Sequence, residues 1–194
     1  MKTAQDVLNF WLDELSPKDW YAGGDALDAQ IRDRFEPTWQ AARDGHLDAW
    51  LNCSDQTLAY ILVTDQFPRN MYRGLAQAFE TDGDALAACK MAVDRNWDLR
   101  IAEPARQFLY MPLMHSESLC DQDRAVRLFL TRMPETGGDN IDHARAHREV
   151  IRRYGRFPYR NDALDRRTTG AEAAFLSGGG YGAILEEVRQ GAAA

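Results

Sequence analysis

The sequence predicts an all-α protein, and three features carry that prediction. Apolar residues recur every three or four positions along most of the chain, two segments begin with the pattern of a helix capping box, and no segment shows the alternation of a β-strand. No glycine-rich phosphate or dinucleotide fingerprint is present. We therefore expect an antiparallel helical bundle of about seven to nine helices.

The first two helices are predicted by caps and apolar spacing. Thr3 and Asp6 have the spacing of a capping box, and the helical period that follows predicts a helix over residues 3–15. A second helix is expected over residues 25–43. Pro37 lies inside it and should kink it, because proline removes one backbone hydrogen bond.

The most apolar segment, Leu58–Val63, predicts a central helix without a polar face. We expect this helix to stop at Phe67-Pro68, since the residue before a proline disfavours the α conformation. Asp65 falls on the same buried face in the last turn, where the helix dipole disfavours an anion. It therefore needs a cationic or hydrogen-bonding partner, either within a functional site or within a structural buried ion pair.

The remaining helices follow from apolar spacing punctuated by proline and glycine. Pro104 is expected in a first helical turn, Pro112 at a helix end, and Gly155 at a C-cap. Thr169 and Glu172 have the spacing of the second capping box, and the triple glycine at residues 178–180 separates the last two helices. Together these signals predict six further helices, over residues 84–96, 104–112, 118–133, 139–154, 169–177 and 181–188.

Composition bounds the class of protein. A chain of 194 residues with 45% hydrophobic content predicts a single domain over residues 1–190, with a frayed tail at 191–194. The three cysteines fit neither a disulfide framework nor a close-spaced metal site, which favours the cytoplasm. The longest apolar run is far too short for a membrane span. The net charge of −7 argues against nucleic acid as a partner.

Two segments, residues 65–70 and 153–161, each carry Phe-Pro followed by an arginine and then an asparagine. Guanidinium groups match carboxylate and phosphate oxygens, so these segments predict an anion clamp. The candidate ligand-binding residues are Arg69, Asn70, Arg156, Arg160 and Asn161. The opposing interpretation of each arginine is a solvated surface charge.

Candidate groups for proton transfer are His115, His147, Asp65 and Glu117. His147 lies on an apolar stripe, so a satisfied core histidine is the alternative to a site role. His143, one turn earlier, would supply only a second metal ligand, and no metal or other cofactor is expected. We place His115 and Glu117 in a loop before a helix N-terminus, where helix capping is the alternative to anion binding.

If the helices alternate in direction, those that end near Phe67, Met111 and Tyr154 end on one side of the bundle. This alternation brings together Asp65, Arg69, His115, Arg156 and Arg160 at one rim. It assumes that the short segment at residues 75–79 is not a separate antiparallel helix.

Three motifs resemble the bacterial family called domain of unknown function 924: residues 62–73, residues 108–117, and His147 with residues 151–161. They keep the family's order. The resemblance implies a tetratricopeptide-like helical array, although no clear 34-residue repeat is visible. Tyr159 stands where the family more usually has histidine, which weakens a mechanism that needs an imidazole there. The family supplies no activity.

Two functions of different class follow. The first is a protein that binds a small anionic ligand bearing phosphate or carboxylate. If this protein is an enzyme, it uses acid–base chemistry. The second is a helical-repeat module that recognises an acidic peptide or tail through its arginines. A closed pocket would favour the first function and an open groove the second.

Overall fold

The computed structural model describes residues 1–191, which contain helices and turns and no strand. The predicted all-α class is confirmed. The chain divides into two compact units, unit 1 (Met1–Pro112) and unit 2 (from Leu113 onward). The single domain over residues 1–190 stays a prediction, and residues 192–194 of the expected frayed tail lie outside the described residues.

Unit 1 contains α-helices joined by short π-helical and 3₁₀-helical segments. Its α-helices are α1 (Ala4–Leu8), α2 (Asp19–Ala22), α3 (Asp25–Arg43), α4 (Ser54–Ile61), α5 (Phe67–Met71), α6 (Asp82–Asp94) and the first part of α7 (Gln107–His115). The π-helical segments are η1 (Asn9–Glu14) and η3 (Leu62–Gln66). The 3₁₀ segments are η2 (Asp48–Asn52), η4 (Ala76–Phe79) and η5 (Asp98–Arg100).

The predicted first helix begins as an α-helix, as expected, and then becomes a π-helix. The capping box of Thr3 and Asp6 is complete in both directions. α1 continues directly into η1, so the residues predicted over 3–15 remain helical although their hydrogen-bonding pattern changes. α3 occupies residues 25–43 as predicted and runs through Pro37.

The core of unit 1 is built from aromatic rings that its helices bring together. α3 packs on α5, and α1 packs on α4. Phe67 from α5 lies between Phe35 and Trp11, with ring centroids at 4.8 and 5.5 Å, and Phe10 lies 5.0 Å from Phe35. All four side chains are fully buried. Such rings contribute packing energy beyond the apolar area that they bury.

The prediction that Phe67-Pro68 ends the central helix is wrong. α4 passes through η3 into α5 without a break, and Pro68 lies in the first turn of α5. Proline cannot donate to the carbonyl one turn before it, which belongs to Thr64. That carbonyl instead accepts a 2.6 Å hydrogen bond from Oγ1 of Thr81, which accepts in turn from Nε1 of Trp39 at 3.1 Å. A tertiary contact thus replaces the lost helical bond.

The predicted helix over residues 104–112 is displaced along the chain. Pro104 lies in a turn, and α7 begins three residues later at Gln107. Pro112 lies inside α7 rather than at its end. His115 is consequently the last residue of a helix, not part of the following loop as predicted.

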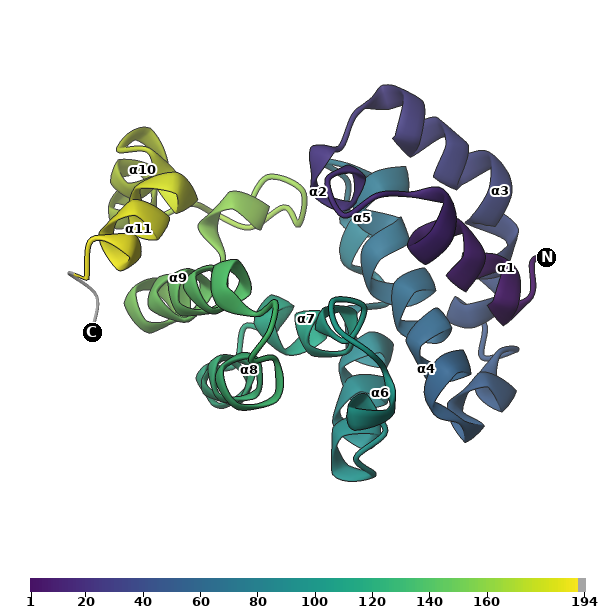
Figure 1. Cartoon of the computed structure of the whole chain (residues 1–194). Coiled ribbons are helices and arrows are strands. Elements are labelled where there is room, and N and C mark those ends of the chain that lie inside the picture. The colour runs from purple at the N-terminus through teal and green to yellow at the C-terminus, as the bar shows by residue number, and fades with distance from the viewer. Residues whose placement is uncertain (192–194) are drawn as a thin grey trace. The chain divides into compact units, whose positions relative to one another are not determined.

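Unit 2 is a smaller set of helices around α9. It contains the end of α7 with α8 (Leu119–Arg132), α9 (Gly138–Tyr154), η6 (Pro158–Arg160), α10 (Gly170–Ser177) and α11 (Gly180–Arg189). Figure 1 shows α9 between α8 and α11, and α9 packs against both. The core here includes Val150, Phe157, Phe175 and Ile184.

Two predicted helix ends in unit 2 are confirmed. Gly155 follows α9 in the left-handed conformation with φ 69°, which glycine adopts without steric cost. Thr169 and Glu172 form a complete capping box at the start of α10. These two ends bracket the segment that carries η6.

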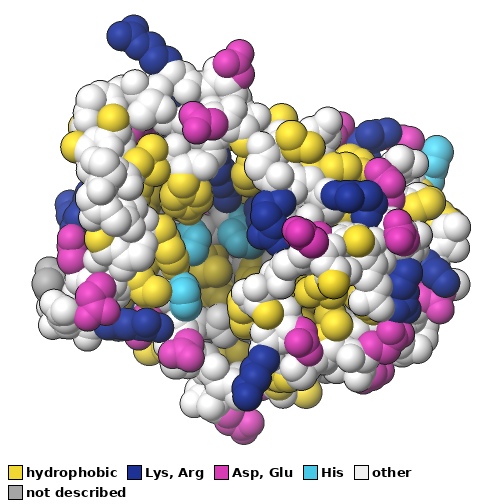
Figure 2. Space-filling model, turned by 90° about the horizontal axis from the view of Figure 1, so that it is seen from above, with side chains coloured by type: hydrophobic (Ala, Val, Ile, Leu, Met, Phe, Trp, Pro, Cys, Tyr) yellow, Lys and Arg dark blue, Asp and Glu magenta, His cyan; other side chains and the backbone are white. Residues whose placement is uncertain are grey.

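The surface mixes charges of both signs. On the face in Figure 2, basic and acidic side chains are interspersed. Over residues 1–191, no helix has both the length and the apolar composition that a membrane crossing requires.

Candidate functional site

Four titratable rings of unit 2 form one group, which we call the imidazole cluster: His115, His143, His147 and Tyr181. His115 ends α7, His143 and His147 lie one turn apart on α9, and Tyr181 lies in the first turn of α11. The ring of His147 is central, with its centroid 4.7 Å from Tyr181 and 6.3 Å from His115. All four residues are partly accessible. In Figure 2, histidine side chains are visible among hydrophobic ones.

His147 is held in one tautomer. Its Nδ1 lies 2.8 Å from the backbone oxygen of His143. A carbonyl oxygen only accepts, so Nδ1 carries the proton and Nε2 carries the lone pair. Burial, and then electrostatic repulsion from the neighbouring His115 ring, lower the pKa of His147 to about 3. The ring is therefore a neutral proton acceptor at Nε2.

His143 and Tyr181 form a second polar contact within the cluster. The hydroxyl of Tyr181 lies 2.6 Å from Nδ1 of His143. Burial raises the pKa of Tyr181 and lowers that of His143, so both groups are neutral. The hydroxyl thus donates to the imidazole, which fixes the rotation of both rings.

Arg160 brings a permanent charge to the imidazole cluster. Its guanidinium carbon lies 4.5 Å from the ring centroid of Phe157, and its Nη2 donates to the backbone oxygen of His115 at 3.1 Å. Only 7% of the residue is exposed. The charge of Arg160 also lowers the pKa of His147, so its field reaches that ring. Tyr159, stacked on Phe157 at 5.3 Å, extends the aromatic wall to the surface.

Arg156 and Asn161 belong to a different network. Arg156 donates from Nε and Nη2 to the carboxylate of Glu172 at 2.6 and 2.8 Å, and also donates to the backbone oxygen of Arg167. Arg156 is the first cause that lowers the pKa of Glu172 to about 2. Asn161 donates to Thr168. These contacts tie the segment after α9 to the start of α10.

Glu117 holds the same segment from the other side. Its carboxylate accepts a 2.8 Å hydrogen bond from the backbone nitrogen of Phe157. Both terminal nitrogens of Arg166 also donate to it, the shortest distance being 2.8 Å. The residue thus anchors the loop that presents Arg160.

Asp65, Arg69 and Asn70 lie in unit 1. The side chain of Asp65 is fully buried, and Nη1 of Arg69 lies 3.2 Å from its carboxylate. Arg69 also lies 2.9 Å from Asp82 through Nη2. The cationic partner expected for the buried Asp65 is therefore Arg69. Asn70 donates from its amide to the backbone oxygen of Gln66.

Two comparisons place the chain among known proteins. The family model described as "Bacterial protein of unknown function (DUF924)" matches residues 7–180. The chain belongs to this family. A solved structure, described as a protein of unknown function from Agrobacterium tumefaciens, is 36% identical, with a TM-score of 0.83. The match covers 90% of the present chain and 97% of that one. No curated protein matches the chain significantly.

In this DUF924 chain, three predicted site residues come together: His115, His147 and Arg160. The others lie in the two networks of unit 2 described above or in unit 1. The expected single rim involves residues of both units, and it stays a prediction. Among residues 1–191, no group of three or more His, Cys, Asp or Glu side chains is placed to hold a metal ion.

Tyr181 is the member of the imidazole cluster that sequence reasoning missed. Its stripe with Ile184, Leu185 and Val188 predicts only a helix face packed on the core. The hydroxyl contact joins residues 38 positions apart, so no local spacing reports it. The one available signal in the sequence was a polar-tipped aromatic residue directly after a triple glycine.

Proposed function

We propose that this DUF924 protein binds a small anionic ligand bearing phosphate or carboxylate at the imidazole cluster, and that His147 exchanges a proton with it. One observation carries the proposal: a neutral imidazole with its lone pair at Nε2 lies within the field of Arg160. A bound anion would offset the positive field and raise the pKa of His147 toward the range in which an imidazole exchanges protons.

The charges around His147 support the choice of an anion. Arg160 carries a permanent positive charge, and this charge lowers the pKa of His147. A site that disfavours an added proton through neighbouring positive charge favours an added negative charge for the same reason. The planar guanidinium of Arg160 suits carboxylate and phosphate oxygens.

The remaining candidates take supporting roles in this proposal. Arg156, Asn161 and Glu117 hold the loop that positions Arg160, because their side chains bond to residues of that loop and of its anchors. Arg69, Asn70 and Asp65 form the corresponding structural set in unit 1. We place the protein in the cytoplasm, since its three cysteines are free thiols.

The test is thermal unfolding in phosphate, sulfate or acetate against chloride at matched ionic strength. We expect the oxyanions to raise the melting temperature of the wild type and to leave Arg160→Gln at its chloride value. Arg148→Gln is the matched control, because Arg148 is also on unit 2 and pairs only loosely with Asp123 at 3.5 Å. It should retain the shift. Equal rises in melting temperature in the wild type and in Arg160→Gln would contradict an anion site at Arg160.

A second readout protects this test if Arg160→Gln is poorly folded. In the wild type, phosphate should move the NMR signals of the His147 ring more than chloride does. Unchanged His147 signals at saturating phosphate would contradict the proposal directly.

The rival function is recognition of an acidic peptide by a tetratricopeptide-like array. The observation in its favour is Tyr159, which is 41% exposed beside the buried Arg160, an arrangement suited to an extended partner. An acidic peptide that raises the melting temperature where inorganic phosphate and acetate do not would select this function instead.

A further inference from the structure

Unit 1 contains a cavity of about 410 Å³, which we call the Trp20 cavity. Its walls come from four parts of the chain: α1 and η1, the segment with Pro17 and Trp20, α4, and the loop around Ala102 and Ala105. Cavities of this volume with mostly apolar walls are the usual form of a small-molecule site.

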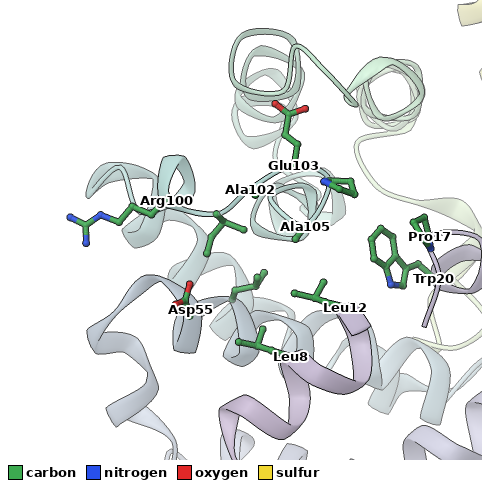
Figure 3. A pocket seen from close by; sticks show the side chains of 12 residues that line it. Leu8, Leu12, Pro17, Trp20, Asp55, Arg100, Ala102, Glu103 and Ala105 are labelled. Atoms are coloured by element: carbon green, nitrogen blue, oxygen red, sulfur yellow. The ribbon is translucent and has the colours of Figure 1, made fainter. Parts of the chain in front are cut away.

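The interior of the Trp20 cavity is apolar. Leu8 and Leu12 form one side, and Ala102 and Ala105 face them from the other (Figure 3). Trp20 closes one end. Its Nε1 already donates to the backbone oxygen of Trp11 at 2.7 Å, so the indole offers a ligand ring surface and no hydrogen bond. The body of any occupant must therefore be apolar.

Charged side chains of both signs lie at the opposite end of the cavity. Asp55, in the first turn of α4, lies at this end and is solvent-exposed. Arg100 lies beside it, but its guanidinium points away from the cavity (Figure 3). Glu103 also lines the cavity, and its carboxylate pairs with Arg106 at 3.6 Å. Asp55 is thus the carboxylate placed to meet a ligand head group.

We propose that the Trp20 cavity binds a small organic cation whose apolar body lies between the leucines and alanines and whose ammonium group meets Asp55. The charge of Asp55 selects a cation over an anion, and the apolar walls select an alkyl or aryl amine over a polyamine. This site is independent of the imidazole cluster, which lies in unit 2 and favours anions.

The test uses three probes with one shared apolar body: 2-phenylethylammonium, 2-phenylethanol and 3-phenylpropionate. Binding is followed by the indole N–H signal of Trp20 in ¹H–¹⁵N spectra. We expect the ammonium to bind most tightly and the carboxylate most weakly. Asp55→Asn should weaken the ammonium by up to about fivefold, since an exposed ion pair is worth about 1 kcal/mol at most, and leave the alcohol unchanged.

Two controls locate the effect. Asp48→Asn removes an exposed acid of unit 1 that does not line the cavity, and it should leave all three affinities unchanged. Ala105→Phe fills the cavity and should abolish binding of the ammonium and of the alcohol. If Ala105→Phe fails to fold, Ala102→Phe serves as the cavity-filling variant instead.

Several results would overturn the assignment. They are tighter binding of the carboxylate than of the ammonium, equal affinities in wild type and Asp55→Asn, unchanged binding after the cavity is filled, or no shift of the Trp20 signal by any probe at millimolar concentration.

Discussion

His147 is the residue whose chemistry the fold changes most. Its backbone hydrogen bond to His143 fixes the proton on Nδ1, and burial makes a second proton costly. The two effects together turn an ordinary imidazole into a base that stays neutral in mildly acidic solution.

This change in His147 predicts a pH dependence of stability. Its pKa is about 3 in the folded chain and about 6.5 in the unfolded chain. Between these values the unfolded chain binds a proton that the folded chain does not, so the free energy of unfolding falls as the pH falls. His147→Asn keeps a donor for the carbonyl of His143 and should flatten this fall in urea unfolding at pH 6.5 to 3.5.

His46→Asn is the matched control for that measurement, because His46 lies on the exposed surface of unit 1. This variant should keep the part of the pH dependence of the unfolding free energy that comes from His147. An unchanged pH dependence in His147→Asn would mean that this imidazole titrates alike in both states.

Asp65 supports a prediction about burial. Removing one partner of a buried ion pair costs about 3 to 5 kcal/mol, whereas an exposed pair is worth about 0 to 1. Arg69 keeps Asp82 as a second partner at 2.9 Å, so we expect Asp65→Ala to lie at the lower end, about 3 kcal/mol. Urea unfolding measures the loss. Asp33→Ala, an exposed acid on α3, should cost far less.

A double variant separates the charge from the packing of Asp65. Adding Arg69→Ala should restore only a small part of the loss, because Asp82 then loses its own partner. Full restoration would show that Arg69 was held by Asp65 alone.

Residue-level prediction from sequence succeeded where the reason was local. Asp65 faces inward because its helix has no polar face, and its cation lies four residues later on the same helix. The grouping of His115, His147 and Arg160 with Tyr181 could not be derived, since it joins helices far apart in sequence. Spacing reports neighbours along a helix, not neighbours across a core.

At the scale of the element, the continuous helix through α4, η3 and α5 shows how tertiary contacts override a local stop signal. Pro68 forbids one helical hydrogen bond, and Thr81 supplies the replacement from outside the helix. Thr81 lies outside the sequence window around Pro68, so local sequence patterns cannot predict its contact, and the predicted helix end at Phe67-Pro68 was wrong. The predictions at Gly155 and at the two capping boxes depend on neighbouring residues only, and they were right.

The bridge by Thr81 is testable. Thr81→Val keeps the shape but removes both the donor to Thr64 and the acceptor for Trp39, which leaves two buried groups unsatisfied. Each such group costs about 1 to 3 kcal/mol. We expect a loss of that order or more in chemical denaturation. Thr131→Val removes a hydroxyl that bonds its own exposed helix, and it should cost much less.

At the scale of the whole molecule, the five tryptophans offer a probe of the predicted single domain. Trp11, Trp20, Trp39, Trp50 and Trp97 all lie in unit 1. Indole fluorescence therefore reports unit 1, whereas circular dichroism at 222 nm reports the helices of both units.

If residues 1–190 form one cooperative domain, the two signals must follow a single urea transition. We expect this coincidence because α7 contains residues of both units, so unfolding either unit removes hydrogen bonds from a shared helix. Fluorescence and circular dichroism midpoints that differ would instead establish two domains that unfold separately.

The whole-molecule class was the part most accessible from sequence. Helical periodicity and the three family motifs predicted an all-α DUF924 protein, and both predictions are confirmed. The tetratricopeptide-like arrangement and the joint rim of the two arginine segments stay predictions. They depend on how helices distant in sequence are placed, which periodicity does not encode.

The π-helical segment η3 has a consequence for how this chain tolerates changes in length. A π-helical turn accommodates one more residue than the α-helical turn it replaces, while the helix on either side keeps its orientation. Losing one residue within Leu62–Gln66 would let α4 join α5 as an ordinary helix with both flanks in place. The same loss within α9 would rotate every later side chain by about 100°. Natural deletions should therefore collect in η3 and be absent from α9.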